Sequence, residues 1–307
     1  MSGGVFLGID GGGTKTEFVC IDGAGKVLAT ALTGTTYHLQ VGFDEVVRRL
    51  ETGAAQVCTA IGITPERIDH AFFGLPAYGE DRSIDPRIHA ACGAVLGHRR
   101  YDVGNDMICG WAGSLGCEDG INIVAGTGSI GYGERQGKSA RVGGWGEVFS
   151  DEGSAYWIAI KGLSLFTRMS DGRTPRGPLY DKLSAALSLE DDLDLCGRIM
   201  GPQGMGRTEI AGLAGLVSEA AIAGDQAAGA ILDEAARELA DMALALRGAL
   251  GFPEGTPVPL SWSGGVLSRE ARVRSEFLRT VRERGFAVIE PRFTPGYGSA
   301  LYARKLA

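Results

Sequence analysis

The feature that most constrains the fold of this chain is a repeat in its predicted order of strands and helices. Each half reads strand, strand, strand, helix, strand, helix, strand, helix, with a glycine-rich turn between its first two strands. The second half adds a mostly helical stretch at residues 179–223, which we predict to be an insertion. The repeat predicts two domains of similar topology whose glycine-rich turns grip one ligand from opposite sides.

Short apolar runs mark the predicted strands, and apolar residues at helical spacing mark the helices. The first half has predicted strands at 5–9, 17–21, 27–32, 71–75 and 101–104, and helices at 43–61, 83–96 and 107–115. The second half has predicted strands at 121–125, 130–134, 139–142, 260–263 and 287–290, and helices at 151–169, 225–250, 268–284 and 298–306. The stretch 33–42 is predicted as a polar and aromatic loop.

The first glycine-rich turn, Asp10-Gly11-Gly12-Gly13-Thr14-Lys15-Thr16, is predicted to bind phosphate. Glycine accommodates positive φ and lets the backbone approach a ligand closely, and the exposed N–H groups of such a turn bind anions. Thr14 and Thr16 would add hydroxyl donors, and Lys15 a positive charge. Asp10 is placed to hold a hydrated Mg²⁺, because hard cations prefer oxygen ligands. The spacing is not that of a P-loop, and an ordinary glycine-rich hairpin is the alternative.

Two turns of the second half are further candidates for nucleotide contacts. Gly126-Thr127-Gly128-Ser129 occupies the place of the first turn in the repeat, so we predict a second phosphate loop. Ser261-Trp262-Ser263-Gly264-Gly265-Val266 ends a strand in a Gly-Gly pair, which would let adenosine lie against the backbone. The alternatives are a tight hairpin turn and a strand-to-helix turn without a ligand.

Asp106 is the candidate general base. It follows the carboxyl end of a predicted strand, where open α/β sheets bind their ligands. A carboxylate there can orient an attacking sugar hydroxyl and accept its proton late in phosphoryl transfer. The alternative is that Asp106 only caps the helix at 107–115, a position that Asp also suits.

A polar and aromatic cluster follows the third strand of the second half. Gly143-Gly144-Trp145-Gly146 presents an indole as an apolar plate for a sugar ring, and Asp151-Glu152-Gly153-Ser154 brings a carboxylate for sugar hydroxyls. The alternative is a plain loop in which Asp151 caps the next helix.

Composition narrows the classes of function. The net charge of −7 argues against a nucleic-acid partner, and no apolar run approaches the roughly 20 residues of a membrane helix. The sequence enters a strand almost at once, so no signal peptide is expected. The six cysteines lack close pairing and the four histidines are scattered. We therefore expect buried, reduced thiols in a cytoplasmic protein with no histidine metal site.

These motifs resemble the actin-like ATPase and sugar-kinase superfamily, and within it the BadF/BadG-type ATPase and N-acetylglucosamine kinase family. The resemblance covers nearly the whole chain. The matching segments are 8–16, Asn105-Asp106, 126–129, 143–146, Asp151-Glu152-Gly153-Ser154-Ala155-Tyr156-Trp157 and Ser263-Gly264-Gly265-Val266. The glycine triplet and the run that begins at Asp151 are the most specific.

The resemblance implies an α/β fold of two duplicated ribonuclease-H-like (actin-like ATPase) domains, with ATP and Mg²⁺ in an interdomain cleft. The first domain would span 1–117, with a C-terminal helix at about 296–307 packed back on it. The second would span 118–295 and include the insertion at about 179–223. The implied activity is transfer of the γ-phosphoryl group to the 6-hydroxyl of N-acetyl-D-glucosamine, by a homodimer.

The resemblance also implies a role for each matching residue. Asp106 would be the catalytic base and Asp10 the magnesium-side carboxylate. The phosphates would lie against Gly11, Gly12, Gly13, Thr14, Lys15, Thr127 and Gly128, the adenosine against Gly264 and Gly265, and the sugar against Asp106, Gly144, Trp145 and Asp151.

The chain departs from the family pattern on the sugar side. Related N-acetylglucosamine kinases carry an Asn in the loop after the third strand, where this chain reads Thr35-Thr36-Tyr37-His38-Leu39. Ile130 also stands where relatives can place Asn. Tyr37 or His38 would substitute as sugar contacts. These departures leave glucosamine and N-acetylmuramate open as alternative substrates.

Three other functions are disfavoured by the sequence. An ATPase that activates a partner enzyme through an iron–sulfur cluster needs suitably placed cysteines, and the chain has no paired spacing. A non-catalytic sugar sensor usually appends a DNA-binding motif, for which no room is expected before the first strand. A zinc-bearing sugar kinase is disfavoured because His and Cys do not cluster.

Overall fold

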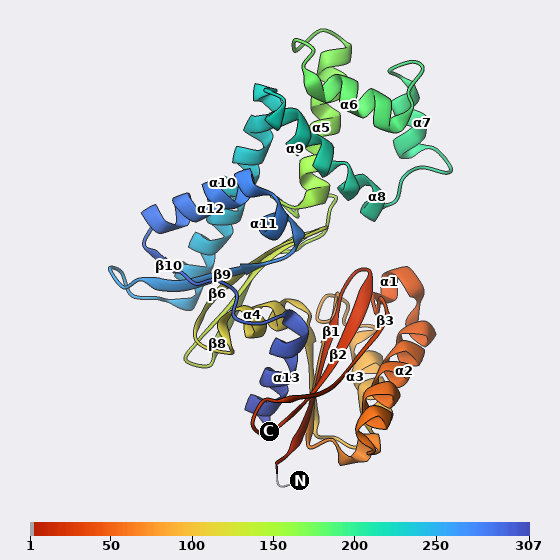
Figure 1. The fold of residues 1–307 in the computed structure, drawn as a ribbon, viewed down its shortest axis with the longest axis vertical. Coiled ribbons are helices and arrows are strands. Elements are labelled where there is room, and N and C mark those ends of the chain that lie inside the picture. Colours follow the sequence, from red (N-terminus) through yellow and green to blue (C-terminus); the bar gives the residue numbers. More distant parts are fainter. Residues whose placement is uncertain (1–2) are drawn as a thin grey trace. The chain divides into compact units, whose positions relative to one another are not determined.

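The computed structural model describes residues 3–307, which form two compact units (Figure 1). Unit 1 contains residues 3–119 and 289–307, and unit 2 contains residues 120–288. Each unit is built on one five-stranded mixed sheet. Each sheet and its helices form a separate α/β body.

The sheet of unit 1 has the strand order β3-β2-β1-β4-β5. Strands β1, β2 and β3 are antiparallel neighbours, and β4 and β5 continue parallel to β1. The strands are β1 (Val5–Gly11), β2 (Lys15–Asp22), β3 (Val27–Gly34), β4 (His70–Leu75) and β5 (Tyr101–Asn105). The ends of β1 and β5 therefore bring Asp10 and Asp106 to the same edge of the sheet, because parallel strands end together.

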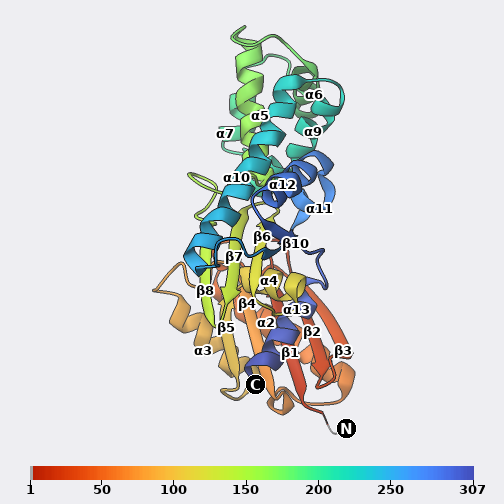
Figure 2. The ribbon, with the colours of Figure 1, turned by 90° about the vertical axis from the view of Figure 1, so that its left-hand side faces the viewer.

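Both faces of this sheet are covered by helices, because β1 and β2 are apolar on both sides. Leu7 and Ile9 pack toward α2 (Phe43–Ile61) and α3 (Asp85–Leu96), while Phe6 packs toward α4 (Met107–Leu115) and α13 (Pro295–Leu306). Alternate residues of a strand face opposite sides, so Asp10 shares the face of Phe6. The two views agree that α13, from the C-terminal end of the chain, lies beside β1 and α4 (Figures 1 and 2).

The sheet of unit 2 repeats this topology. Its order β8-β7-β6-β9-β10 matches that of unit 1 strand for strand, with the first three strands antiparallel and the last two parallel. The strands are β6 (Gly120–Ala125), β7 (Ser129–Arg135), β8 (Lys138–Gly143), β9 (Val258–Ser263) and β10 (Phe286–Val288). The predicted repeat of three strands followed by two further strands is confirmed.

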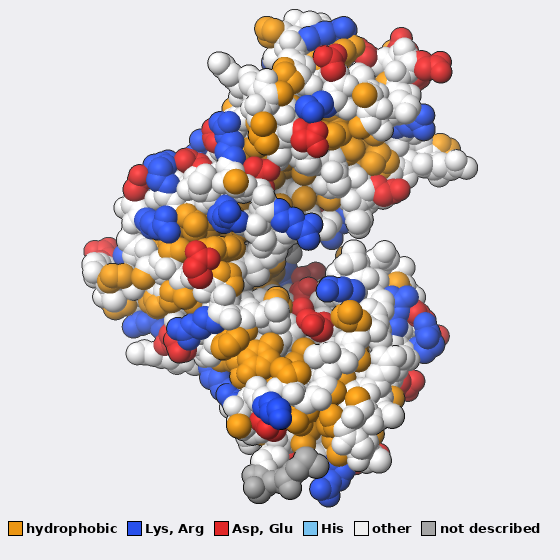
Figure 3. Space-filling model, in the orientation of Figure 1, with side chains coloured by type: hydrophobic (Ala, Val, Ile, Leu, Met, Phe, Trp, Pro, Cys, Tyr) orange, Lys and Arg blue, Asp and Glu red, His pale blue; other side chains and the backbone are white. Residues whose placement is uncertain are grey.

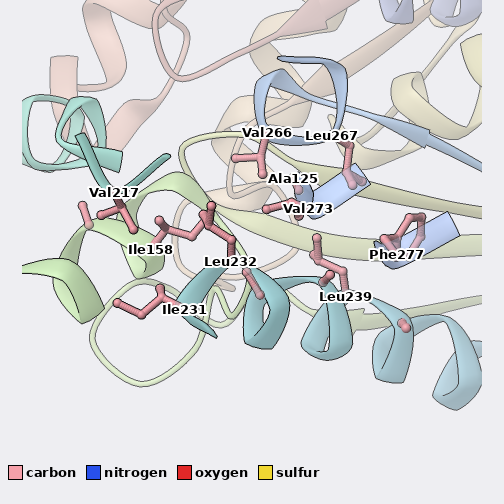
Figure 4. Packing of buried hydrophobic residues seen from close by; sticks show 14 of the residues in the cluster. Ala125, Ile158, Val217, Ile231, Leu232, Leu239, Val266, Leu267, Val273 and Phe277 are labelled. Carbon is pink, nitrogen blue, oxygen red and sulfur yellow. The ribbon is translucent and has the colours of Figure 1, made fainter. Parts of the chain in front are cut away.

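The core of unit 2 is organised around α10 (Gln226–Leu250), whose alanine-rich face packs on the sheet and on α12 (Ala271–Glu283). Figure 4 shows Leu232 and Leu239 of this helix turned toward Val273 and Phe277. Asp225 caps α10 by accepting hydrogen bonds from the N–H groups of Ala227 and Ala228. The remaining helices are α5 (Ala155–Ser170), α6 (Pro178–Leu187), α7 (Asp194–Met200), α8 (Arg207–Gly212), α9 (Ala214–Ile222) and α11 (Gly265–Arg269). We call α6 to α9 the helical insertion.

Three element predictions were wrong in detail. The helix predicted at 268–284 is two helices, because Glu270 is extended and its side chain caps α12 by accepting from Arg272 N. The helix predicted from 151 begins at Ala155, because Asp151 and Gly153 have positive φ and cannot join a helix. The predicted loop 33–42 contains the end of β3 and a short helix, α1 (His38–Val41); a 3₁₀ turn, η1 (Pro65–Arg67), was also missed.

The cysteines follow the sequence prediction in part. Cys20, Cys58, Cys92 and Cys109 are buried as expected, whereas Cys117 is half-buried and Cys196 exposed, so the expectation of buried thiols is wrong for these two. Across residues 3–307, no helix combines the length and the apolar character that a membrane crossing demands. On the face drawn in Figure 3, basic and acidic side chains are interspersed over each unit.

Candidate functional site

The β1–β2 hairpin is closed by a single tight turn. Gly11 pairs with Thr16, and Gly12 N donates to Lys15 O at 2.8 Å, which leaves Gly13 and Thr14 exposed at the tip. None of the three glycines has a positive φ, so backbone conformation does not explain them. A Cβ at Gly11 would lie 2.5 Å from Thr36 Oγ1, whereas a Cβ at Gly13 would meet nothing within 4 Å. Packing therefore requires glycine at 11, and the open space at 13 is free for a ligand.

Two threonines that follow β3 hold this hairpin by hydrogen bonds, a role that no sequence pattern indicated. Thr35 Oγ1 donates to Gly12 O at 2.6 Å and accepts from Tyr37 N at 3.0 Å. Thr16 is fully buried, and its hydroxyl donates to Thr36 Oγ1 at 3.1 Å. The prediction that Thr16 offers its hydroxyl to a phosphate is therefore wrong, because that hydroxyl lies inside the unit.

Asp10 and Asp106 form an electrostatically coupled pair of carboxylates in unit 1. The pKa of Asp10 is raised to about 7, first by burial and then by the charges of Asp106 and Glu17, against a hydrogen bond from the Cys109 thiol. Glu17 lies directly opposite Asp10 in the β1–β2 register. A cation stabilises negatively charged carboxylates that lie close together in a site shielded from water. The carboxylate at Asp10 therefore fits the predicted magnesium role.

Asp106 stands at the N-cap position of α4. The side chain of Asp106 makes no capping hydrogen bond to the described first turn of α4. Asn105 does this instead, since its Oδ1 accepts from Met107 N at 3.2 Å. The carboxylate of Asp106 therefore lies in the field of Asp10 without serving as the cap of the helix.

Tyr37 and His38 lie at the start of α1. Tyr37 is the N-cap residue, and its ring lies edge-on to the His38 imidazole, with 6.2 Å between the two ring centroids. His38 is only 8% exposed, and within the described residues neither of its ring nitrogens has a hydrogen-bond partner. Leaving a buried polar group unpaired is unfavourable. A ligand that offers a hydroxyl or carbonyl would remove that cost, which supports His38 as a binding residue.

The second glycine turn connects β6 and β7 as predicted. Gly126 N donates to Gly128 O at 2.8 Å, and Ala155 N at the start of α5 donates to Gly126 O at 2.9 Å. The β9–α11 turn lies alongside: a Cβ at Gly126 would be 3.9 Å from Gly265 N, and one at Gly264 would collide with the backbone of Ala125. The structure thus brings together the two nucleotide-binding turns predicted for the second half.

Asp151 is held beside this turn. It is 3% exposed, its backbone is left-handed at φ +62°, and its Oδ2 accepts from Arg207 Nη2 at 2.5 Å. Burial raises the pKa of Asp151, while Arg207 and a hydrogen bond from the Ser129 backbone oppose that rise. The alternative that Asp151 caps α5 is wrong, because Ser154 Oγ accepts from Trp157 N at 3.1 Å. Nothing in the sequence pattern singled out Arg207.

Trp145 is presented by a strongly turned segment. Gly143, Gly144 and Gly146 all have positive φ, which brings the indole out to 74% exposure. Trp145 borders a cavity of about 380 Å³, whose other walls include Phe149, Glu152, Glu238 and Met242. An aromatic plate beside carboxylates can contact both the apolar face and the hydroxyls of a sugar.

Comparison with known proteins identifies the family. Residues 7–303 match the sequence profile of the BadF/BadG/BcrA/BcrD ATPase family. The chain belongs to this family. The resemblance drawn from the motifs is therefore confirmed, and the match covers both units.

Proteins named as sugar kinases are among those to which this chain is similar. The chain is 33% identical over 273 residues to the N-acetylmuramic acid/N-acetylglucosamine kinase of Clostridium acetobutylicum, covering 88% of each chain. It is 30% identical over 314 residues to the N-acetyl-D-glucosamine kinase of Dictyostelium discoideum, covering 99% of this chain and 98% of the relative. A solved structure from Chromobacterium violaceum, described as a candidate N-acetylglucosamine kinase, aligns with a TM-score of 0.73 at 24% identity, covering 98% of both chains. That likeness confirms the predicted fold class.

Proposed function

We propose that this protein is an ATP-dependent amino-sugar kinase that phosphorylates the 6-hydroxyl of N-acetyl-D-glucosamine. The observation that carries the proposal is the pair of Asp10 and Asp106, coupled at the strand ends of unit 1, with capping of α4 left to Asn105. The relatives that bear kinase names support the reaction class. Glucosamine and N-acetylmuramate are the alternative acceptors.

In this proposal Asp106 orients the 6-hydroxyl and accepts its proton as the new bond to phosphorus forms. Asp10 would hold hydrated Mg²⁺, which supplies positive charge to the phosphates. The backbone of Gly11, Gly12 and Gly13, with Thr14 and Lys15, would bind phosphate oxygens from unit 1. Thr127 and Gly128 would do so from unit 2, where Gly264 and Gly265 would lie beside the adenosine.

The proposed acceptor contacts differ in kind. Asp151 accepts sugar hydroxyls, Gly144 and Trp145 lie against the ring, and His38 with Tyr37 takes the place of the family's Asn. The imidazole of His38 offers one donor and one acceptor when neutral. An N-acetyl group presents a carbonyl and an N–H, so it can satisfy such a residue. We further propose a cytoplasmic homodimer.

A coupled kinase assay over N-acetylglucosamine, glucosamine and N-acetylmuramate tests the proposal. We expect the highest kcat/KM for N-acetylglucosamine, and loss of turnover in Asp106→Asn with ATP binding close to wild type. Wild-type turnover in Asp106→Asn would refute the base assignment. A clear preference for glucosamine would refute the N-acetyl specificity and direct attention to Tyr37 and His38.

The alternative class, an ATPase that activates a partner enzyme, has its own signature. An anaerobically purified sample would be brown, with the broad visible absorption of an iron–sulfur cluster. We expect a colourless protein whose ATP consumption depends on the sugar. A brown protein with sugar-independent ATPase activity would overturn the kinase proposal.

A further inference from the structure

Arg207, the first residue of α8, extends from the helical insertion to a buried carboxylate. Its Nη2 donates to Asp151 Oδ2 at 2.5 Å, and its Nε lies 3.1 Å from Glu147 Oε2. The Asp151 side chain is almost completely buried, whereas Arg207 is about one-third exposed. One guanidinium thus bridges two carboxylates that precede α5.

This bridge lies directly against the second glycine turn. A Cβ at Gly128 would be 2.6 Å from Arg207 Nη2 and 2.7 Å from Asp151 Oδ2. Gly128 has no positive φ, so its lack of a side chain is explained by this close approach. The geometry therefore packs the predicted phosphate turn, the predicted sugar carboxylate and the helical insertion around one arginine.

Arg207 also decides the charge balance around Asp151. Among the described residues, the charged groups that face Asp151 are Arg207 from α8 and Glu147 from the segment between β8 and α5. The backbone N–H of Ser129 faces it as well. A buried carboxylate is stable only when paired, and a second carboxylate nearby favours its protonated form. Without Arg207, Asp151 and Glu147 would repel each other with no cation between them.

We propose that Arg207 is a positioning residue that holds Asp151 ionised and correctly oriented to accept hydroxyls of the acceptor sugar. The inference rests on the proposed kinase function, and makes the helical insertion a part of the acceptor site. It gives Asp151, whose left-handed backbone is already unusual for a residue other than glycine, a fixed side-chain direction. Arg207 acts through Asp151 and contacts no reacting atom.

Steady-state kinetics test this positioning role in two variants, Arg207→Gln and Arg207→Lys, with Arg198→Gln as the control. Arg198 is an exposed arginine of α7 in the same insertion. We expect Arg207→Gln to raise the KM for the sugar about tenfold or more, as for loss of a charge-assisted contact, with the KM for ATP nearly unchanged. The acidic limb of kcat/KM for the sugar should move to higher pH. In Arg207→Lys the acidic limb should return most of the way to its wild-type pH, and Arg198→Gln should match wild type.

Glu147→Gln supplies a test of opposite sign, and serves if Arg207→Gln does not fold. Removing the Glu147 charge should move the same acidic limb to lower pH, because that charge raises the pKa of Asp151. The inference would be overturned if a folded Arg207→Gln protein kept the wild-type KM for the sugar and the wild-type acidic limb. It would also be overturned if the acidic limb did not move in Glu147→Gln. Either result would leave the proposed kinase function standing. A wild type inactive on every amino sugar would instead refute the proposed function, and the sugar role of Arg207 with it.

Discussion

At the scale of single residues, Asp10 is a carboxylate whose surroundings disfavour its charged form. Its neighbours Glu17 and Asp106 carry the same charge, and burial removes water that would stabilise ionised Asp10. Such an arrangement disfavours the ionised form of Asp10, and a bound cation would offset this. Asp10 should therefore lower stability at high pH.

Replacing Asp10 by Asn should remove this pH dependence. The pKa of Asp10 is raised from 3.8 to about 7 in the folded state. Between these values the folded protein binds more protons than the unfolded one, so the free energy of unfolding falls as pH rises. In EDTA, Asp10→Asn should gain on the order of 2–4 kcal/mol relative to wild type between pH 4 and pH 8. Denaturant titrations of both proteins at pH 4 and pH 8 measure this. A stability difference between Asp10→Asn and wild type that is the same at both pH values would contradict the prediction.

Gly11 and Gly13 of the β1–β2 hairpin allow a packing role to be tested separately from a ligand-binding role. Gly11→Ala should destabilise the protein by about 1–3 kcal/mol, because its Cβ would overlap Thr36. Gly13→Ala should leave the melting temperature nearly unchanged, since nothing lies within 4 Å of the added Cβ, yet raise the KM for ATP. Thermal melts and ATP kinetics on both variants decide this. Unaltered ATP kinetics in Gly13→Ala would remove the phosphate role of that residue.

At the scale of elements, the connection from β3 to α1 holds the phosphate hairpin in place. Thr35 links Gly12 to the backbone of Tyr37, so the proposed phosphate turn and the proposed sugar contacts share one hydroxyl. Arg49 of α2 adds to this by donating to Thr35 O at 2.5 Å. The segment after β3 that carries the proposed sugar contacts is thus also a support of the hairpin.

Thr35→Val should disturb both ligands together. Loss of two partly buried hydrogen bonds should reduce the free energy of unfolding by about 1–3 kcal/mol and raise the KM values for ATP and for sugar. Thr30→Val, an exposed change on β3, is the matched control. If Thr35→Val altered stability but neither KM, the coupling of hairpin and loop would be refuted.

At the scale of the whole molecule, the chain leaves unit 1 after Asp119 and returns to it at Ile289. The return ends in α13, which packs closely on β1 at Gly8 and on α4 at Gly298, because these two glycines carry no side chains. A Cβ at Gly8 would collide with the backbone of Ala300, and one at Gly298 with the backbone of Gly113. Unit 1 is therefore built from both ends of the sequence.

Gly8→Ala should consequently disrupt unit 1 by displacing α13, with a loss of at least about 3 kcal/mol, since a backbone collision cannot be relieved by a side-chain rotation. Gly248→Ala in α10 is the control: its Cβ meets nothing within 4 Å, and alanine should stabilise the helix by roughly 0.5–1 kcal/mol. Urea titrations measure both, and equal effects would contradict the prediction.

The sequence by itself determined the repeat, the fold class and most of the elements. Strand and helix periodicity depends on nearest neighbours along the chain, and each glycine-rich turn stands between two recognisable strands. Local patterns placed Asp10 and Asp106 at the ends of β1 and β5, which run parallel on either side of β4 and so end at the same edge of the sheet. The family resemblance added candidate roles for residues such as Trp145 and Asp151.

Only the tertiary structure decided which side chains share a partner. The pairing of Thr16 with Thr36, and of Arg207 with Asp151 across 56 positions of sequence, leaves no periodic trace. The reasons for glycine at 11 and 128 were likewise invisible, because they are collisions with side chains from elsewhere in the chain. Periodicity reports which face of an element is buried, whereas these contacts depend on which elements meet.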